Sequence, residues 1–392
     1  MRRYIQKFKD AFLKGDLILL LLCVVTTAFG CLMIASATAA SASGPLRYLL
    51  VQIGASVAGV LIYVWISSID AEVFSEHRMF LVIGNAILLL MLIPFGINVN
   101  GNKSWIDFPF LPFNIQPAEI CKITFILIMA SVMASNQNRL SSIRSLGHMA
   151  WHLGVLFGLN MIISGDMGVS LIFAFIFAGM TFAGGVSLIW FLGAIGVVAI
   201  VSPIIWNYVL ADYQKTRILV LFDPSLDPLG IDAMYQTVRA QRSLTGGGMT
   251  GQGLFNGTRT QTTGSLVAQH TDFIFAAIGE ELGYVGCALV LLVLFLIIAR
   301  CVWVGVRSPD FMRRLICFGA ASALFFQVLI NVGMVLGVMP VIGLTLPFIS
   351  YGGSSIITLY AMLGLVSGVY AHPNATSHER YIRAPLVSYR GR

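Results

Sequence analysis

Ten apolar segments, each about as long as a membrane-spanning helix, follow one another through this 392-residue chain. A helix that crosses the hydrocarbon core of a bilayer needs about 20 mostly apolar residues. Only 10% of the residues are charged and the mean hydropathy is +0.86, whereas about 25% are charged in soluble domains. The chain is therefore expected to be all-α and to span the membrane ten times, over 17–38, 48–69, 79–97, 117–135, 149–164, 167–184, 187–209, 273–299, 315–338 and 354–371.

The positive charges between these segments predict the orientation of the chain. Ten spans return the C-terminus to the side of the N-terminus, and Lys and Arg are enriched in cytoplasmic segments. With both termini inside, the short outer loops hold only Arg47 and Lys103. We therefore expect a multi-pass protein of the cytoplasmic (inner) membrane. Its predicted parts are a cytoplasmic segment at 1–16, one ten-span domain at 17–371 and a basic cytoplasmic tail at 372–392.

One predicted connection is long. Residues 210–272 lie between the seventh and eighth spans on the outer face and are rich in Gly, Thr and Gln. A loop of this length in a compact chain is more often functional than not. Its stretch from Arg239 to Gly253, which includes Arg242, has no apolar periodicity. We therefore expect amphipathic or re-entrant segments at the membrane surface.

The eighth span begins beside ionisable residues. His270, Thr271 and Asp272 precede it, and Glu280 and Glu281 lie two turns inside it. A charged side chain at mid-bilayer costs about 2.5–3.5 kcal/mol, so one that is retained at membrane depth indicates a functional site. Asp272 fits both a catalytic role and a helix cap. One of the two glutamates is expected to pair with a donor on another span.

Two more polar groups are predicted at the same outer end. Glu119 and Lys122 are three residues apart in the fourth span and so share one helical face. The two residues are interpreted either as a functional pair or as a buried ion pair in which each charge neutralises the other. Asp166 lies between the fifth and sixth spans, where a catalytic acid and a turn-forming helix cap are both plausible.

Two prolines and four glycines interrupt the chain between 337 and 355, near Ser350 and Ser354. Broken backbone at membrane depth is tolerated only where it is buried in protein or lines a wet cavity. The small residues there leave room either for a ligand or for close helix packing.

The six cysteines lie in apolar runs without paired spacing, which indicates neither disulfides nor a zinc site. Carboxylates such as Asp272 and Glu119 suit a divalent cation, magnesium or manganese. No phosphate-binding loop motif is present, so no nucleotide cofactor is expected. The net charge of +7 is too diffuse to indicate nucleic acid and suits contact with membrane lipid.

Three blocks in this order resemble the SEDS family, the shape, elongation, division and sporulation proteins. They are QPAEICK at 116–122, HTDFIFAAIGEELG at 270–283 and PVIGLTLPFISYGGSS at 340–355, and the resemblance covers nearly the whole chain. It implies a peptidoglycan glycosyltransferase that polymerises lipid II at the outer face, for elongation, division or sporulation. It also implies a growing glycan on undecaprenyl pyrophosphate and a class B penicillin-binding protein as the partner transpeptidase.

The resemblance implies roles for particular residues. Asp272 matches the family's essential outer-face aspartate, Glu119 and Lys122 its fourth-span pair, Asp166 its turn acid, and Arg47 a family arginine. We expect Asp272, Glu119 and Asp166 to be catalytic, and expect the apolar neighbours of Asp272 to raise its pKa. The expected substrate-binding residues are Lys122, Arg47, Lys103, Trp105, His270, Thr271, Arg239, Arg242, Ser350 and Ser354.

The chain departs from the family pattern in places. Ser104 precedes Trp105 where an arginine is usual, Asn114 is a second difference, and Ser164 stands where Gln begins the usual motif around the turn acid. These departures affect the cations expected to face the pyrophosphate.

Two other functions fit parts of the pattern. A flippase for a lipid-linked cell-wall precursor also has many spans, broken helices and intramembrane acids. Alternating access, however, places polar groups near the midplane, whereas here they gather at one face. A non-catalytic scaffold that positions a transpeptidase is a third hypothesis.

Overall fold

The computed structural model describes residues 12–41, 44–71, 73, 77–99, 102–109, 111–208, 212–227, 234–262, 266 and 268–372. Most of the predicted N-terminal segment, parts of the long loop and all of the predicted tail except His372 lie outside these residues. Within them, nine helices are long and apolar enough to cross a membrane, and a tenth apolar helix, α9 (Met167–Ala183), has 17 residues.

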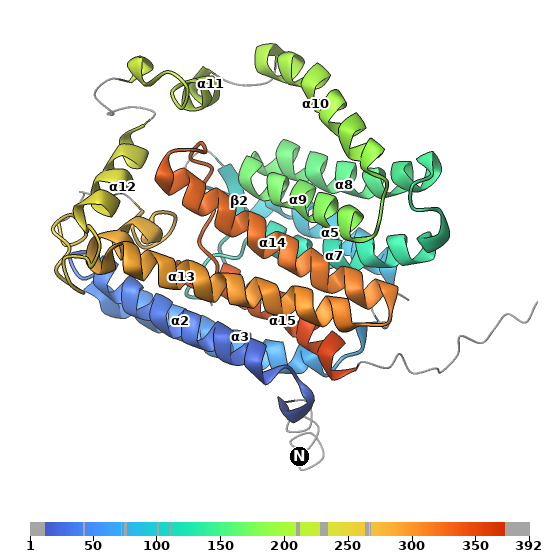
Figure 1. Ribbon diagram of the computed structural model, residues 1–392, viewed down its shortest axis with the longest axis horizontal. Coiled ribbons are helices and arrows are strands. Elements are labelled where there is room, and N and C mark those ends of the chain that lie inside the picture. The colour runs from blue at the N-terminus through green and yellow to red at the C-terminus, as the bar shows by residue number, and fades with distance from the viewer. Residues whose placement is uncertain are drawn as a thin grey trace, which may run out of the picture.

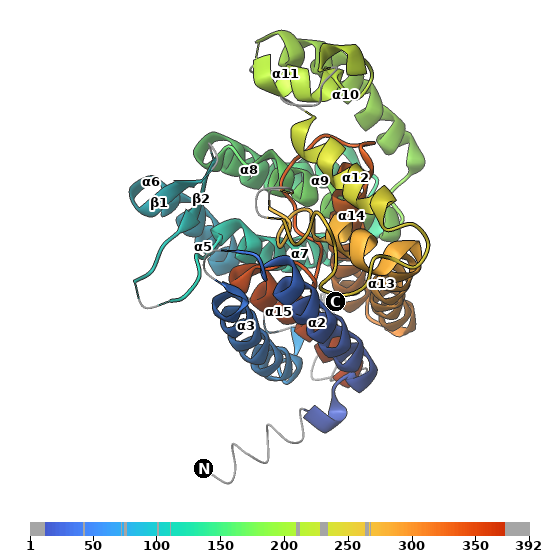
Figure 2. The same cartoon turned by 90° about the vertical axis from the view of Figure 1, so that its left-hand side faces the viewer.

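All ten predicted apolar segments are helical. Besides α9, the helices are α2 (Leu17–Ala37), α3 (Gly44–Ser67), α5 (Arg78–Leu90) with α6 (Leu92–Phe95), α7 (Pro117–Ser135), α8 (Ile143–Ser164), α10 (Leu188–Tyr208), α13 (Ile274–Arg307), α14 (Phe311–Leu336) and α15 (Gly353–Ala371). Most of them form one bundle, whereas α10 stands apart from the rest and has no buried side chain among its described residues (Figures 1 and 2).

Helices α8 and α13 extend furthest beyond the apolar segments that predict them. Helix α8 begins at Ile143 and not near 149, because the Ser142 side chain accepts a hydrogen bond from the Ser145 N–H and caps its first turn. Helix α13 continues past 299 to Arg307, because Arg300 is neutralised by Asp16. Both extensions contain polar and charged residues, so the apolar pattern did not predict them.

The prediction of an all-α fold is wrong in one place. The third span was expected to reach 97, but α6 ends at Phe95 and a strand, β1 (Gly96–Val99), pairs antiparallel with β2 (Asn102–Ile106). In this hairpin Ile97 lies opposite Trp105.

Close packing of α3 against α15 depends on glycine. A Cβ atom on Gly59 would lie 2.7 Å from the Tyr360 ring, and one on Gly364 would lie 2.9 Å from the carbonyl oxygen of Tyr63. Larger residues at these positions would therefore push the two helices apart. Helices α13 and α14 run antiparallel beside this pair, joined by a short turn (Figure 1).

The described part of the long loop contains α11 (Asp212–Leu219), a short 3₁₀ turn (Pro224–Leu226) and α12 (Tyr235–Gly246). The segment 252–262 packs against the start of α13. Glu280 accepts hydrogen bonds from the N–H groups of Arg259 and Thr260, and Glu281 accepts one from the Ser36 hydroxyl of α2 at 2.6 Å. The expected pairing of a glutamate with another span is thus confirmed for Glu281.

Two ion pairs close the opposite end of the bundle. Arg300 binds Asp16 in a bidentate pair at 2.8 and 3.1 Å, and Arg313 donates to both oxygens of Asp70 at 3.0 Å. Arg313 also donates to the carbonyl of His372, after the end of α15. The Asp16 N–H also donates to the Ser367 hydroxyl of α15 at 3.0 Å, so the first and last helices of the bundle meet at this end.

Candidate active site

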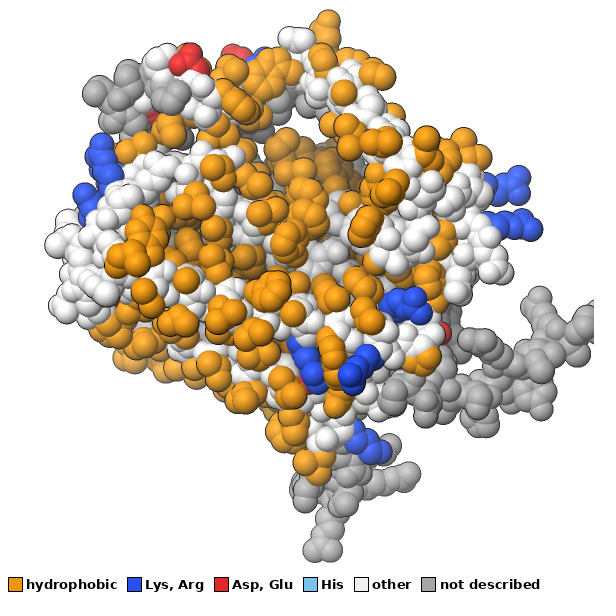
Figure 3. Space-filling view, in the orientation of Figure 1, with side chains coloured by type: hydrophobic (Ala, Val, Ile, Leu, Met, Phe, Trp, Pro, Cys, Tyr) orange, Lys and Arg blue, Asp and Glu red, His pale blue; other side chains and the backbone are white. Residues whose placement is uncertain are grey.

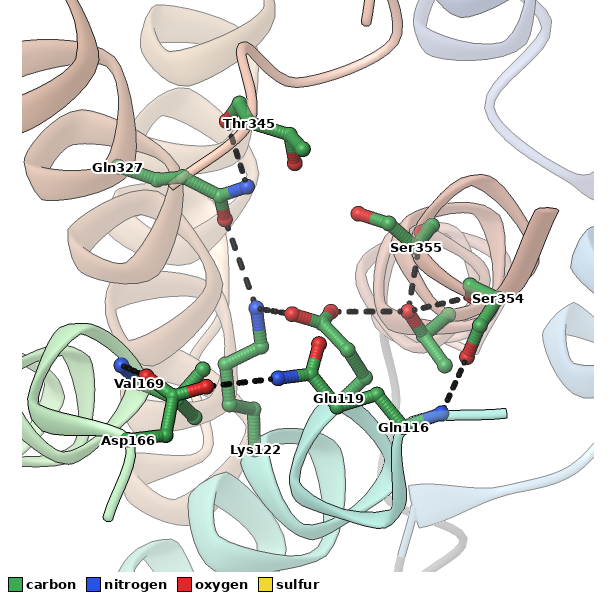
Figure 4. Close-up of polar contacts among 10 residues, drawn as sticks. Gln116, Glu119, Lys122, Asp166, Val169, Gln327, Thr345, Ser354 and Ser355 are labelled. Atoms are coloured by element: carbon green, nitrogen blue, oxygen red, sulfur yellow. Dashed lines mark hydrogen bonds and ion pairs between the residues drawn. The ribbon is translucent and has the colours of Figure 1, made fainter. Parts of the chain in front are cut away.

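The first turns of α7 hold a buried ion pair. Lys122 Nζ lies 2.8 Å from Glu119 Oε1, and both side chains are almost fully buried. Glu119 Oε2 accepts from the Thr358 hydroxyl of α15 at 3.1 Å, and Lys122 donates to Gln327 Oε1 of α14 at 3.5 Å (Figure 4). The pair thus ties three helices together and carries no net charge.

Asp166 is both a helix cap and a member of this cluster. Its Oδ1 accepts from the Val169 N–H at 3.1 Å and so caps α9, while its Oδ2 accepts from Gln116 Nε2 at 2.9 Å (Figure 4). Burial is the main cause that raises the pKa of Asp166, and the nearby charge of Glu119 raises it further. The cap interpretation is confirmed, and the contact with Gln116 places the acid at the start of α7.

Asp272 is not the cap of α13. Phe273 occupies that position and makes no side-chain capping bond. Within the described part of the chain, the Asp272 carboxylate has no hydrogen-bond partner. Burial raises the pKa of Asp272 to about 6, and the charge of Asp166 adds to this effect. Asp272 therefore presents a carboxylate whose proton affinity is suited to a general base near neutral pH.

Two amides on α14 connect these acids through the broken segment 337–352. Gln327 Nε2 donates to the carbonyl of Thr345 at 3.0 Å, while its Oε1 faces Lys122 (Figure 4). One turn later, Asn331 Nδ2 donates to the carbonyls of Asp272 at 2.8 Å and Leu344 at 2.6 Å. Both side chains are buried. Gln327 thus holds the broken segment beside the Glu119–Lys122 pair, and Asn331 holds it beside Asp272.

Gln327 and Asn331 were not predicted from the sequence. The available signal was two amides at i and i+4 in an otherwise apolar segment, a spacing that places them on one helical face.

Replacing Asn331 by Leu should destabilise the protein. The carbonyls of Asp272 and Leu344 would both lose a donor, and a buried polar group left unpaired costs about 1–3 kcal/mol. Thermal unfolding of the purified chain measures this change. The matched control is Leu329→Ala, a lipid-exposed position on the same helix that should change the unfolding temperature little; equal unfolding temperatures for Asn331→Leu and wild type would refute the role.

The predicted serines hold backbone at this site. The Ser350 hydroxyl donates to the carbonyl of Thr271 at 2.6 Å and accepts from the Leu346 N–H, and Ser354 Oγ accepts from the Gln116 N–H at 3.2 Å. Ser350 thus links the broken segment to the residues before α13, and Ser354 links α15 to the start of α7.

His270 lies in a small aromatic group. Its ring centroid is 5.0 Å from that of Tyr48 and 5.7 Å from that of Tyr351. Burial lowers the pKa of His270, so the imidazole is neutral at neutral pH. Arg47 is exposed at the start of α3, and its charge acts on the neighbouring Tyr351 by lowering a phenol pKa that burial raises.

The remaining predicted cations lie on other elements. Lys103, two residues before Trp105 on β2, donates from Nζ to the carbonyl of Ile93 at 2.6 Å. On α12, Arg239 covers the ring of Tyr235 at 4.1 Å, and Arg242 is exposed. Hydrogen bonds, an ion pair and electrostatic interactions thus connect Glu119, Lys122, Asp166 and Asp272. Among the described residues, Lys103, Arg239 and Arg242 lie on other elements and make their contacts there.

Two departures from the family pattern contact each other. The hydroxyls of Ser104 and Ser164 are 2.6 Å apart, and both residues are buried. A small hydroxyl pair therefore stands where the family pattern has an arginine and a glutamine.

These features define a polytopic membrane protein with a buried acidic site at one end of its bundle. Residues 16–375 match the FtsW, RodA and SpoVE family model, described as cell cycle protein, and the chain belongs to this family. The expected family is thereby confirmed.

Relatives in the family are similar over most of their length. The peptidoglycan glycosyltransferase MrdB of Escherichia coli K12 is 34% identical over 325 residues, which cover 82% of this chain and 85% of that protein. Stage V sporulation protein E of Bacillus subtilis is 31% identical, covering 90% of this chain and 96% of that protein.

Solved structures share the fold. A chain from a study of the structural coordination of polymerization and crosslinking by a peptidoglycan synthase complex has a TM-score of 0.77 and 28% identity, covering 92% of this chain and 99% of that one. The rod shape determining protein RodA of Thermus thermophilus has a TM-score of 0.65 and 26% identity, covering 92% of this chain and 97% of that one.

Proposed function

We propose that this chain is a peptidoglycan glycosyltransferase that polymerises lipid II at the outer face of the cytoplasmic membrane. The observation that carries this is Asp272, a carboxylate without a hydrogen-bond partner among the described residues, held by Asn331 beside a buried acidic cluster. The relatives support the reaction class, because MrdB is named a peptidoglycan glycosyltransferase.

In the proposed reaction, Asp272 takes the proton of a sugar 4-hydroxyl on the incoming lipid II. The hydroxyl oxygen forms a bond to the anomeric carbon of the growing glycan, whose bond to undecaprenyl pyrophosphate breaks. The pyrophosphate leaves with the electron pair, and the proton remains on Asp272 until it passes to solvent. A base of matched pKa contributes about 10² to 10⁴-fold to such a step.

Cations outside the acidic cluster are proposed to face the leaving group. Lys122 is already neutralised by Glu119 at 2.8 Å. The exposed Arg47, together with Lys103, Arg239 and Arg242, remain the proposed contacts of the pyrophosphate. Glu119 and Asp166 are proposed to hold α7, α9 and α15 in position.

A divalent cation held by Asp272 and Glu119 does not fit these contacts well. Both Glu119 oxygens are engaged, one by Lys122 and the other by Thr358. A metal ion at Glu119 would have to displace the buried Lys122 ammonium. The proposed reaction therefore includes no metal-dependent step.

We further propose ten spans, with α9 as the sixth, both termini in the cytoplasm and the loop 210–272 outside. The apolar character of α9 and the excess of Lys and Arg on the predicted inner side support this orientation. The partner is proposed to be a class B penicillin-binding protein, since a similar chain is known from a peptidoglycan synthase complex.

Gel-resolved polymerisation of purified lipid II tests the function. The full chain is reconstituted alone and with a class B penicillin-binding protein, and glycan strands are expected in at least one condition. If lipid II crosses the liposome membrane and no polymer forms, the result would contradict the glycosyltransferase and support the flippase hypothesis.

The rate of polymerisation should depend on pH in a predictable direction. Because the pKa of Asp272 is raised to about 6, its carboxylate is protonated below that value and cannot accept the hydroxyl proton. Activity should therefore rise as the pH increases through about 6 and then level off. A rate that stays constant from pH 5 to pH 8 in the same assay would remove Asp272 as the titrating base.

A further inference from the structure

The end of α13 carries a stacked group of cations and an aromatic ring far from the acidic site. The guanidinium of Arg300 and that of Arg307 each lie 4.1 Å from the centre of the Trp303 ring. Arg300 is also 5.4 Å from the ring of Tyr370 at the end of α15. We call Arg300, Trp303 and Arg307 the arginine platform.

The arginine platform is held from beneath by a buried acid. Asp16 is 1% exposed and binds Arg300 in the bidentate pair, while its own oxygen also accepts from the Leu19 N–H and caps α2. This arrangement fixes Arg300, and Arg300 fixes one face of Trp303. Rigid support of this kind reduces the ordering cost of binding a ligand.

One positive charge of the platform remains uncompensated. Arg300 is neutralised by Asp16, but Arg307 is exposed and has no ion pair within the described residues. Asp310, three residues later, uses Oδ1 to cap α14 through the Arg313 N–H. In Figure 3 Lys and Arg side chains gather near the right-hand end of α13, at the edge of an apolar surface.

The apolar surface below the platform is continuous with it. Val285, Leu289, Leu292 and Leu296 are exposed and follow one another at spacings of four, three and four residues, and the same spacing continues into Arg300, Trp303 and Arg307. All seven residues therefore lie on one face of α13. From Leu292 to Trp303 the helix rises about 16 Å, roughly one leaflet of a 30 Å hydrocarbon core.

We propose that the arginine platform binds the phosphate of an anionic phospholipid, phosphatidylglycerol being the probe, with an acyl chain along the leucine face below it. A tryptophan and arginines at the end of an apolar stripe match the chemistry of the membrane interface, and basic sites on the cytoplasmic side bind acidic headgroups. This site goes beyond the proposed reaction and does not depend on it, although it uses the proposed orientation of α13.

Native mass spectrometry of the full chain in detergent, titrated with phosphatidylglycerol or phosphatidylcholine, tests the proposal. Phosphatidylglycerol should bind the wild type more tightly than phosphatidylcholine, and Arg307→Gln should weaken its binding about fivefold, the effect of about 1 kcal/mol for one arginine near anionic lipid. Arg307 is exposed, so this variant should fold normally. Trp303→Leu, which keeps both charges but removes the shared ring, should also weaken binding.

The matched control is Arg144→Gln, an exposed arginine in the first turn of α8 at the same predicted membrane face. It should leave phosphatidylglycerol binding unchanged. Equal binding by wild type and Arg307→Gln, or equal binding of the two lipids, would overturn the proposal. Inorganic phosphate that competes as well as phosphatidylglycerol would assign the platform to a free anion and would likewise overturn the lipid site.

Discussion

Replacing Asp272 by Asn should abolish glycan polymerisation while leaving the protein folded. The amide keeps the shape of the side chain but cannot accept the hydroxyl proton, so a loss of about 10² to 10⁴-fold is expected. Gel-resolved polymerisation of lipid II measures it, with the level of membrane-inserted protein as the reference.

The stability of the same variant separates a catalytic role from a structural one. The pKa of Asp272 is raised by burial, so the folded state binds more protons than the unfolded state between about pH 4 and pH 6, and the carboxylate lowers stability as the pH rises through this window. Asp272→Asn removes this cost at neutral pH. Its unfolding temperature should therefore equal or exceed that of the wild type, and a large decrease would show that Asp272 supports the fold.

Replacing Lys122 by Met should strongly destabilise the bundle. The change would leave Glu119 buried without its cation, and removing one partner of a buried ion pair costs about 3–5 kcal/mol. The unfolding temperature and the yield of folded protein in detergent measure the effect. Adding Glu119→Gln to this variant should restore most of the stability, because no buried charge then remains.

The charge-reversed double variant of this pair should recover only part of the stability. A glutamate at 122 would face Gln327 Oε1, and turning that amide would cost its bond to the Thr345 carbonyl. The control for Lys122→Met is Lys215→Met. Lys215 Nζ lies 3.6 Å from Oδ1 of Asp212, whose side chain is fully exposed, so losing this ion pair should change the stability little. A Lys122→Met variant as stable as this control would contradict the role of the buried pair.

The helices were predictable from the sequence because the signal for a membrane span is local. Long apolar runs gave all ten helical segments, and the largest errors at their ends arose where a charged or polar residue has a hydrogen-bond or ion-pair partner. Arg300 extends α13 because Asp16, 284 residues earlier in the chain, neutralises it. The β-hairpin was missed although Asn100 and Gly101 form a dipeptide typical of hairpin turns.

The site was predictable in part. Glu119, Lys122 and Asp166 stood out because charge is costly at membrane depth, and their contacts with Gln327, Thr358 and Gln116 became visible only in three dimensions. Asn331 was missed because an amide in an apolar helix gives no indication of which distant carbonyls it binds. The contact between Ser104 and Ser164 was likewise hidden, since each departure from the family pattern appears alone in the sequence.

The most direct test of the proposed function counts two products of one reaction. Purified lipid II is incubated with the reconstituted chain, and the glycosidic bonds formed and the undecaprenyl pyrophosphate released are quantified together. We expect one undecaprenyl pyrophosphate for each glycosidic bond in the wild type and neither product with Asp272→Asn. Equal polymer formation by Asp272→Asn and the wild type would contradict the assignment of Asp272 as the base. If the wild type forms no polymer with its partner present, the proposed glycosyltransferase activity is contradicted.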